Sequence, residues 1–281
     1  MSDSGLLPPR PADFSDGPVA LAWFSNIAET LLNRCEVVVG GVVHHLIEVE
    51  FYCNTEGHKD PFTHGDPMQK LWGHWYFHRT NGVLRSGSFK GVDLSFGDGQ
   101  GFCGVLCRGL EAEDGTVIDG PSLLVDRLLE MTRFSSLQAL DKAVAARKAW
   151  DPGNHVLLRE SAQPRSDPLL QTPRVGLSLK KATGNSSMHA FLMRPYRFLT
   201  QPRKTAKGKT HMALALHARG LSPEEISART GCPLKSVRSY IADFEAGRQE
   251  TDFTPYHGAD MKGADLCRVY GLWHAHYGSR L

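Results

Sequence analysis

The sequence has no apolar run long enough to cross a bilayer. Residues 1–18 are rich in proline and carry three aspartates, but they lack the basic start and apolar core of a secretory signal peptide. We therefore expect a flexible lead at residues 1–18, a cytoplasmic location and no membrane partner.

Cysteine pairs and phosphate-loop signals are also missing. Six cysteines in 281 residues do not form a disulfide framework and favour a reducing compartment. Cys103 and Cys107 lack the second pair of ligands that a tetrahedral zinc site needs. The glycine-rich stretch 97–101 is not followed by a helix with Lys-Ser or Lys-Thr, so we read it as a hairpin turn. These absences predict no metal and no cofactor.

Charge is nearly balanced overall but unevenly distributed along the chain. The formal net charge is +2, yet the stretch from Arg194 to Arg248 contains eleven Lys and Arg but only four Asp and Glu. A basic stretch of this kind favours a polyanionic partner, whereas a solvated basic surface is an equally simple explanation of the charge alone.

Hydrophobic periodicity up to about residue 200 alternates between helix and strand patterns. Residues 19–34 have helical spacing, residues 36–53 read as two strands around Gly40-Gly41, and Asn81-Gly82 is a strong hairpin signal. Further expected elements are strands at 92–97 and 101–111, short strands or edges at 173–177 and 194–198, helices at 119–131 and 134–150, and mostly loop at 151–173. We predict an α+β fold with a mixed, mainly antiparallel, curved sheet flanked by helices over residues 19–203.

Residues 204–250 have a different pattern, which predicts a small helical module. Two helical stretches end at Gly220 and Gly231, a capping box pairs Ser222 with Glu225, and a longer helix follows. This order is typical of a helix-turn-helix, in which the exposed start of the last helix would contact DNA through Lys235, Ser236, Arg238 and Ser239. The alternative is a helical hairpin that only packs on the core. Residues 251–281 are expected to be a tail that packs on the core.

Two carboxylates interrupt the apolar strand LIEVEFY at 46–52. Alternation places Glu48, Glu50 and Tyr52 on one face of the strand. Burying a carboxylate is costly unless it is paired or has a function. With Arg108 and His64 nearby, these groups could form a pocket for a planar ligand, or Glu and Arg could be a structural ion pair.

Seven segments between residues 20 and 200 match, in order and spacing, a known set of motifs. They are IEVEFY (47–52), Asp60 to His64, the Asn81-Gly82 hairpin, GVDLS (91–95), GVLCRGLE (104–111), PRVGL (173–177) and RPYRF (194–198). In these segments the chain resembles the alkyladenine (3-methyladenine) DNA glycosylase family of the mammalian type.

The resemblance implies a monofunctional glycosylase that acts on double-stranded DNA carrying a modified base, without metal or cofactor. Glu50 matches the glutamate that activates water for attack on the sugar, and Arg108 matches an arginine beside it. Tyr52 and His64 match the residues that sandwich the extruded base. We expect the enzyme to act as a monomer.

The chain departs from the family at three places. Asp93 stands where the family has an asparagine, and an acceptor there suits an exocyclic amine. The hairpin lacks the family's intercalating tyrosine, which Arg79, Asn81 or Leu84 would replace. The helix-turn-helix and the tail lie outside the family's core.

These departures leave the substrate and the biological role open. The substrate is either an alkylated purine, as in DNA repair, or a bulky modified cytosine of phage DNA, as in antiviral defence. The alternative from another class is a DNA-binding regulator that keeps a glycosylase-like scaffold without activity.

Overall fold

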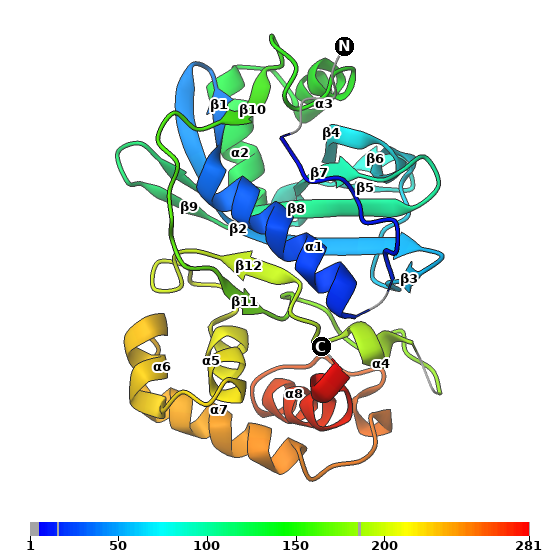
Figure 1. Ribbon diagram of the computed structural model, residues 1–281, viewed down its shortest axis with the longest axis vertical. Helices are drawn as coiled ribbons and strands as arrows, with labels where there is room; N and C mark the ends of the chain where they lie inside the picture. Colours follow the sequence, from blue (N-terminus) through cyan, green and yellow to red (C-terminus); the bar gives the residue numbers. More distant parts are fainter. Residues whose placement is uncertain (1–5, 16, 185–186, 281) are drawn as a thin grey trace. The chain divides into compact units, whose positions relative to one another are not determined.

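The computed structural model describes residues 6–15, 17–184 and 187–280 (Figure 1). By their internal contacts they divide into two units. Unit 1 contains the chain up to Lys59, Thr63–Leu169 and Phe198–Thr200, and unit 2 contains Asp60–Phe62, Leu170–Arg197 and the chain from Gln201 onwards.

A ten-stranded, mainly antiparallel sheet with flanking helices confirms the α+β prediction. Its main path runs β10-β1-β2-β8-β7-β4, while β3 and β12 pair with β2 and β9 pairs with β8. The bounds of nine of its strands are β1 (Cys35–Val39), β2 (Val42–Thr55), β3 (His58–Lys59), β4 (Trp72–Phe77), β7 (Val92–Phe96), β8 (Phe102–Ala112), β9 (Val117–Asp119), β10 (Val156–Glu160) and β12 (Arg197–Leu199), and the tenth is β11, given below.

Helix α1 (Pro18–Glu29) covers one face of this sheet and continues into a π-helical turn at Thr30–Arg34 (Figure 1). The rings of Phe24 and Phe51 stack with centroids 4.9 Å apart, and both side chains are fully buried. From Val49 to Cys53, past the irregularity in register at Glu48, the odd-numbered residues of β2 therefore face the apolar core, which leaves the even-numbered ones to the opposite face.

The remaining elements of unit 1 surround the sheet. They are α2 (Pro121–Thr132), α3 (Leu137–Ala145), the 3₁₀ turns η2 (Pro67–Lys70) and η3 (Gly87–Phe89), and the hairpin β5 (Arg79–Thr80) with β6 (Val83–Leu84). Part of the expected lead, residues 1–5 and 16, lies outside the described residues. Its described part packs on α1, since the Phe14 and Trp23 rings are 5.1 Å apart and Trp23 Nε1 donates to Pro8 O at 3.1 Å.

Unit 2 is mainly helical. Its elements are β11 (Leu170–Thr172), α4 (Met188–Phe191), α5 (Lys209–Ala218), α6 (Pro223–Thr230), α7 (Leu234–Gly247), η4 (Thr254–Tyr256), α8 (Ala264–Tyr277) and η5 (Gly278–Arg280). The predicted capping box is present, with the Ser222 hydroxyl accepting from Glu225 N and Glu225 Oε2 accepting from Ser222 N. Helices α5, α6 and α7 pack pairwise.

The core of unit 2 joins segments that are far apart in sequence. Leu179, Leu192 and Met193 cluster with Phe244 and with the buried face of α8. The region 251–281 thus supplies a fourteen-residue helix to this core. No helix in the described ranges has both the length and the hydropathy needed to span a bilayer.

Two local predictions differ from the structure. Residues 156–160, which lie in the stretch expected to be mostly loop, form β10 and pair antiparallel with β1. Residues 173–177, expected to be a strand, form none. In both cases a distant partner decided the outcome, because a strand exists only where a second strand satisfies its backbone groups.

Candidate functional site

The predicted site residues of unit 1 lie on the sheet face opposite α1. The register pairs Tyr76 with Asp93, Asp93 with Leu106 and Leu106 with Glu50, so these residues form one row across four strands. Cross-strand partners point to the same face. Glu50 and Asp93 are two strands apart, which corresponds to roughly 10 Å.

Arg108 holds both carboxylates of β2. Its Nε donates to Glu48 Oε1 at 2.6 Å, and its Nη1 donates to Glu50 Oε2 at 3.2 Å. Burial by itself would lower the pKa of the Arg108 guanidinium, but Glu50 and Glu48 outweigh burial and raise that pKa. The structure therefore brings Arg108 to Glu48 and Glu50, which share one face of β2 as the alternation pattern predicted.

The two glutamates differ in their access to solvent. The Glu50 side chain is 6 % exposed and the Glu48 side chain 1 %. Arg108 also binds Glu48 at the shorter distance, 2.6 Å against 3.2 Å. Glu48 is thus the more deeply buried and more closely held of the two, while Glu50 keeps a small exposed fraction.

Asp93 organises the neighbouring side chains and is fully buried. Tyr52 donates its hydroxyl proton to Asp93 Oδ2, and His78 Nε2 lies 2.7 Å from Asp93 Oδ1. Since a carboxylate only accepts, Nε2 carries the proton of His78. Both oxygens of Asp93 thus accept from protein side chains. Burial, followed by the charge of Asp93, raises the pKa of the Tyr52 phenol.

The Tyr52 ring lies over Gly104, its cross-strand partner, and a Cβ at Gly104 would be 2.2 Å from the Tyr52 hydroxyl oxygen. The centroids of the Tyr52 and His64 rings are 6.4 Å apart with an interplanar angle of 35°. The His78 ring meets His64 edge to face at 4.8 Å. Three flat rings therefore lie around one buried carboxylate.

His64 is exposed on one side, in contrast to Tyr52. Desolvation by the surrounding protein, followed by the charge of His78, lowers the pKa of His64 to about 4. The ring is therefore neutral at physiological pH and presents an uncharged face.

The hairpin β5–β6 has the predicted turn, with positive φ at both Asn81 (51°) and Gly82 (79°). Asn81 is exposed at this turn. Arg79, by contrast, binds Asp141 of α3 with Nη2 to Oδ2 at 2.6 Å. The most exposed apolar side chains of this region are instead Val83 (70 %) and Phe89 (74 %), which hydrophobicity alone would have assigned to the core.

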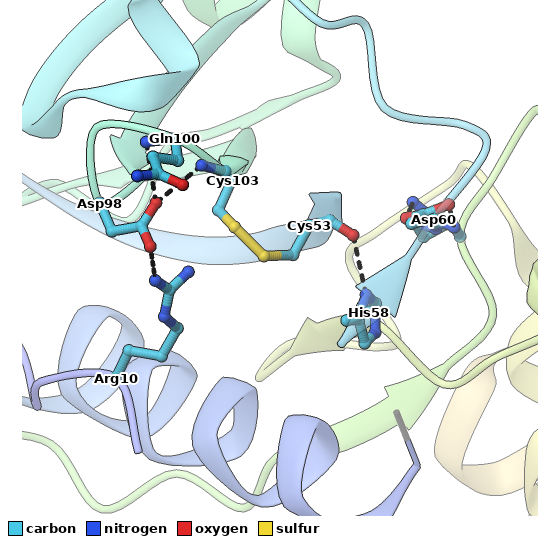
Figure 2. The surroundings of a disulfide bond; sticks show 9 residues. Arg10, Cys53, His58, Asp60, Asp98, Gln100 and Cys103 are labelled. Carbon is cyan, nitrogen blue, oxygen red and sulfur yellow. Dashed lines mark hydrogen bonds and ion pairs between the residues drawn. A yellow bond between two sulfur atoms is a disulfide. The ribbon is translucent and has the colours of Figure 1, made fainter. Parts of the chain in front are cut away.

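A disulfide joins β2 to β8 on the sheet face that packs on α1. It links Cys53 to its register partner Cys103 (Figure 2). The other four cysteines, Cys35, Cys107, Cys232 and Cys267, are buried and free. The expectation of reduced cysteines therefore fails at one pair, because two strands distant in sequence pair at these residues. The bridge covalently links the two strands that carry Glu50 and Arg108, on the opposite face of the sheet from these side chains.

The ends of these strands border a cavity of about 1100 Å³ lined in part by Arg10, Phe14 and Phe102. Arg10 forms an ion pair with Asp98 there (Figure 2). Although burial opposes it, hydrogen bonds from the Gly101 and Gln100 amides and from Arg10 lower the pKa of Asp98 to about 2. No predicted site residue lines this cavity.

The predicted contacts of the helical module lie at the start of α7 in unit 2. Lys235, Arg238 and Ser239 are exposed, and Ser236 is half-buried. Arg238 Nη2 binds Glu224 Oε1 at 2.8 Å, and both side chains remain about 60 % exposed (62 % and 59 %). Within the described ranges, no group of three or more His, Cys, Asp or Glu is placed to hold a metal ion.

The residue that the sequence reasoning missed is His78. Its only signal was its place after the aromatic strand β4, opposite the strand that carries Asp93. A lone histidine at such a position has no distinguishing pattern, and the contact with Asp93 arises only from strand pairing.

No protein-family model matches the chain. The protein described as "Uncharacterized protein L759" of Acanthamoeba polyphaga mimivirus is 33 % identical to it over 173 residues, which cover 56 % of this chain and 80 % of the mimivirus protein.

Proposed function

The chain belongs to the same family as protein L759 of Acanthamoeba polyphaga mimivirus, whose name states no activity, and from the site we propose that the chain is a monofunctional DNA glycosylase. In this proposal the protein flips a modified base out of the duplex and hydrolyses its N-glycosidic bond. The reaction leaves an abasic site and needs no metal.

The observation that carries the proposal is the unequal carboxylate pair on Arg108. Breaking a glycosidic bond develops positive charge on the sugar, which a nearby carboxylate stabilises while it takes a proton from the attacking water. Glu50 suits this role because its side chain is 6 % exposed and is held 3.2 Å from the Arg108 guanidinium. Glu48 serves as the second, structural acid.

The spacing of the rings supports base binding. Stacked bases are separated by about 3.4 Å, so a flat base placed between two rings needs them roughly 7 Å apart. The Tyr52 and His64 centroids are separated by 6.4 Å. Tyr52 is fixed by Asp93, whereas His64 is exposed and neutral and can move slightly to admit a base.

The second element of the proposal is the helix-turn-helix. Lys235, Arg238 and Ser239 are exposed within the first two turns of α7, where a recognition helix contacts DNA. Ser236 lies beside them and is half-buried. This module would raise affinity for duplex DNA through phosphate and base-edge contacts.

The substrate of the proposed activity is a modified base, either an alkylated purine or a bulky modified cytosine. Since both oxygens of Asp93 accept from Tyr52 and His78, we assign Asp93 to holding these two side chains. Mass spectrometry of bases released from alkylated DNA and from phage DNA with modified cytosine distinguishes the two sources.

The test of the activity replaces Glu50 with Gln. Glu50→Gln should lower base release by about 10²- to 10⁴-fold, the contribution of a positioned general base, and leave the affinity for DNA nearly unchanged. The matched control is Glu36→Gln, which removes another buried, arginine-paired glutamate outside the site. Release is measured as alkali-labile sites and free base. A Glu50→Gln protein with the wild-type rate refutes the proposal, and DNA binding without release from any substrate favours the regulator.

A further inference from the structure

The loop that carries the β5–β6 hairpin contains a hollow of about 500 Å³ outside the site described above. It is lined by Thr80, Val83, Leu84, Arg85, Ser86 and Phe89. Val83 and Phe89 are among the most exposed large apolar side chains of the described residues, at 70 % and 74 %. Exposing such side chains to water is unfavourable, so two of them that line one hollow point to a binding surface.

The base of this loop is connected to the candidate site. His78 N donates to Gly91 O and Arg85 N donates to His78 O, both at 2.9 Å, which closes the loop. The His78 side chain then reaches Asp93 at 2.7 Å, and Asp93 accepts from Tyr52. The backbone of His78 therefore closes the loop, and its side chain binds the carboxylate that fixes the proposed base-binding ring.

The chemistry of the lining fits a nucleobase. Phe89 offers an aromatic face, and Val83 and Leu84 add apolar contact. Arg85 is the one charged residue of the lining, and its Nε donates to Thr80 Oγ1 at 3.0 Å. An aromatic face next to a cation, with no carboxylate in the lining, is the composition of surfaces on which unpaired bases stack.

We propose that this hollow binds the base that loses its partner when the target nucleotide is flipped out. The inference rests on the glycosylase function proposed above, because flipping the target nucleotide leaves its partner base unpaired. Phe89 is the stacking residue, and Arg85 provides the positive charge that attracts the phosphates beside it.

Binding to synthetic duplexes tests the proposal without any catalytic step. One duplex carries a tetrahydrofuran abasic analogue opposite a normal base, and the second carries the analogue on both strands. The wild-type protein should bind the first duplex about 5- to 100-fold more tightly, which is the effect of one base stacked on an aromatic ring.

Variants assign this preference to the hollow. Phe89→Ser should abolish the ratio between the two duplexes, and Phe89→Trp should keep it. The control Leu71→Ser removes another exposed apolar side chain, 41 % exposed, that does not line the hollow, and it should keep the ratio.

If the wild-type protein binds the two duplexes equally tightly, the inference is overturned. A Phe89→Ser protein that loses affinity equally for both duplexes also overturns it, since Phe89 would then only fill the gap in the stack. Failure of the glycosylase function gives a different result: the ratio persists, but no base is released from any modified DNA.

Discussion

Arg108 is one cation between two buried acids, and this arrangement is stable only as a set of three. Its side chain is 6 % exposed, as is that of Glu50, and Glu48 is more deeply buried at 1 %. Such triads contribute little net stability but are costly to break, because a charge is then left buried without its partner. The site is therefore sensitive to single substitutions.

Arg108→Gln should destabilise the protein by about 3–5 kcal/mol, because two carboxylates remain buried without their cation. Adding Glu48→Gln should restore part of this loss, since one of the stranded charges is then neutral. Urea unfolding of both proteins measures the effect. Arg248→Gln removes a 45 % exposed arginine from its pair with the 44 % exposed Glu245 and should cost about 1 kcal/mol or less. Equal stability of the two arginine variants would contradict the buried triad.

His64 should make stability depend on pH. Desolvation and His78 lower its pKa from 6.5 to about 4, so the unfolded chain binds the proton at a higher pH than the folded chain. The free energy of unfolding should therefore fall as pH drops from 6.5 towards 4, and that of the His64→Gln variant should fall less. Urea midpoints at pH 7, 5.5 and 4.5 test this, with His155→Gln as the control outside the site. Identical pH curves for His64→Gln and the wild type would rule out the lowered pKa.

At the scale of elements, strand β2 divides its residues between two functions. Phe51 faces α1 and Cys53 binds Cys103 on that side, whereas Glu50 and Tyr52 face the candidate site. One strand can do both because successive side chains point to opposite faces. A one-residue slip in register would move the carboxylates into the apolar core, so the core itself fixes the site.

The start of α7 carries the prediction for DNA binding. The double variant Lys235→Gln/Arg238→Gln should reduce the slope of log affinity against log salt by about 2, since each cation that contacts a phosphate contributes about 1. Fluorescence anisotropy with a duplex at several salt concentrations measures the slope.

The control for this element is Arg268→Gln on α8, which removes an arginine that pairs with Glu250. It should leave the salt slope unchanged. If the α7 double variant also leaves the slope unchanged, the module does not bind DNA through α7 and is a helical packing element only.

At the scale of the whole molecule, unit 2 combines the chain before residue 200 with the helices after it. Leu179, Leu192 and Met193 belong to the same buried cluster as residues of α5, α7 and α8. The sequence-based boundary at residue 203 therefore passes through a shared hydrophobic core.

A chain truncated after residue 203 should lose solubility or bind hydrophobic dyes, because the cut exposes the apolar surface of Leu179, Leu192 and Met193. A chain that ends at Gly278 retains all of α8 and serves as the control. Soluble yield and dye binding measure the difference. A well-folded, soluble 1–203 fragment would show that the unit 2 cluster is not required.

Local signals determined much of the fold. The helix over 19–34, the turn at Gly40-Gly41, the Asn81-Gly82 hairpin and the Ser222–Glu225 capping box all formed as predicted. The alternation of LIEVEFY also placed Glu48 and Glu50 on one face. Each of these features depends on residues within a few positions of one another, and the backbone geometry there is set by the residues themselves.

The tertiary structure alone decided the pairing of β10 with β1, the Cys53–Cys103 bridge and the contact of His78 with Asp93. It also decided which of Glu48 and Glu50 is the more deeply buried. The physical reason is that these features join residues far apart in the chain. Such contacts follow from strand register and core packing, which no local pattern encodes.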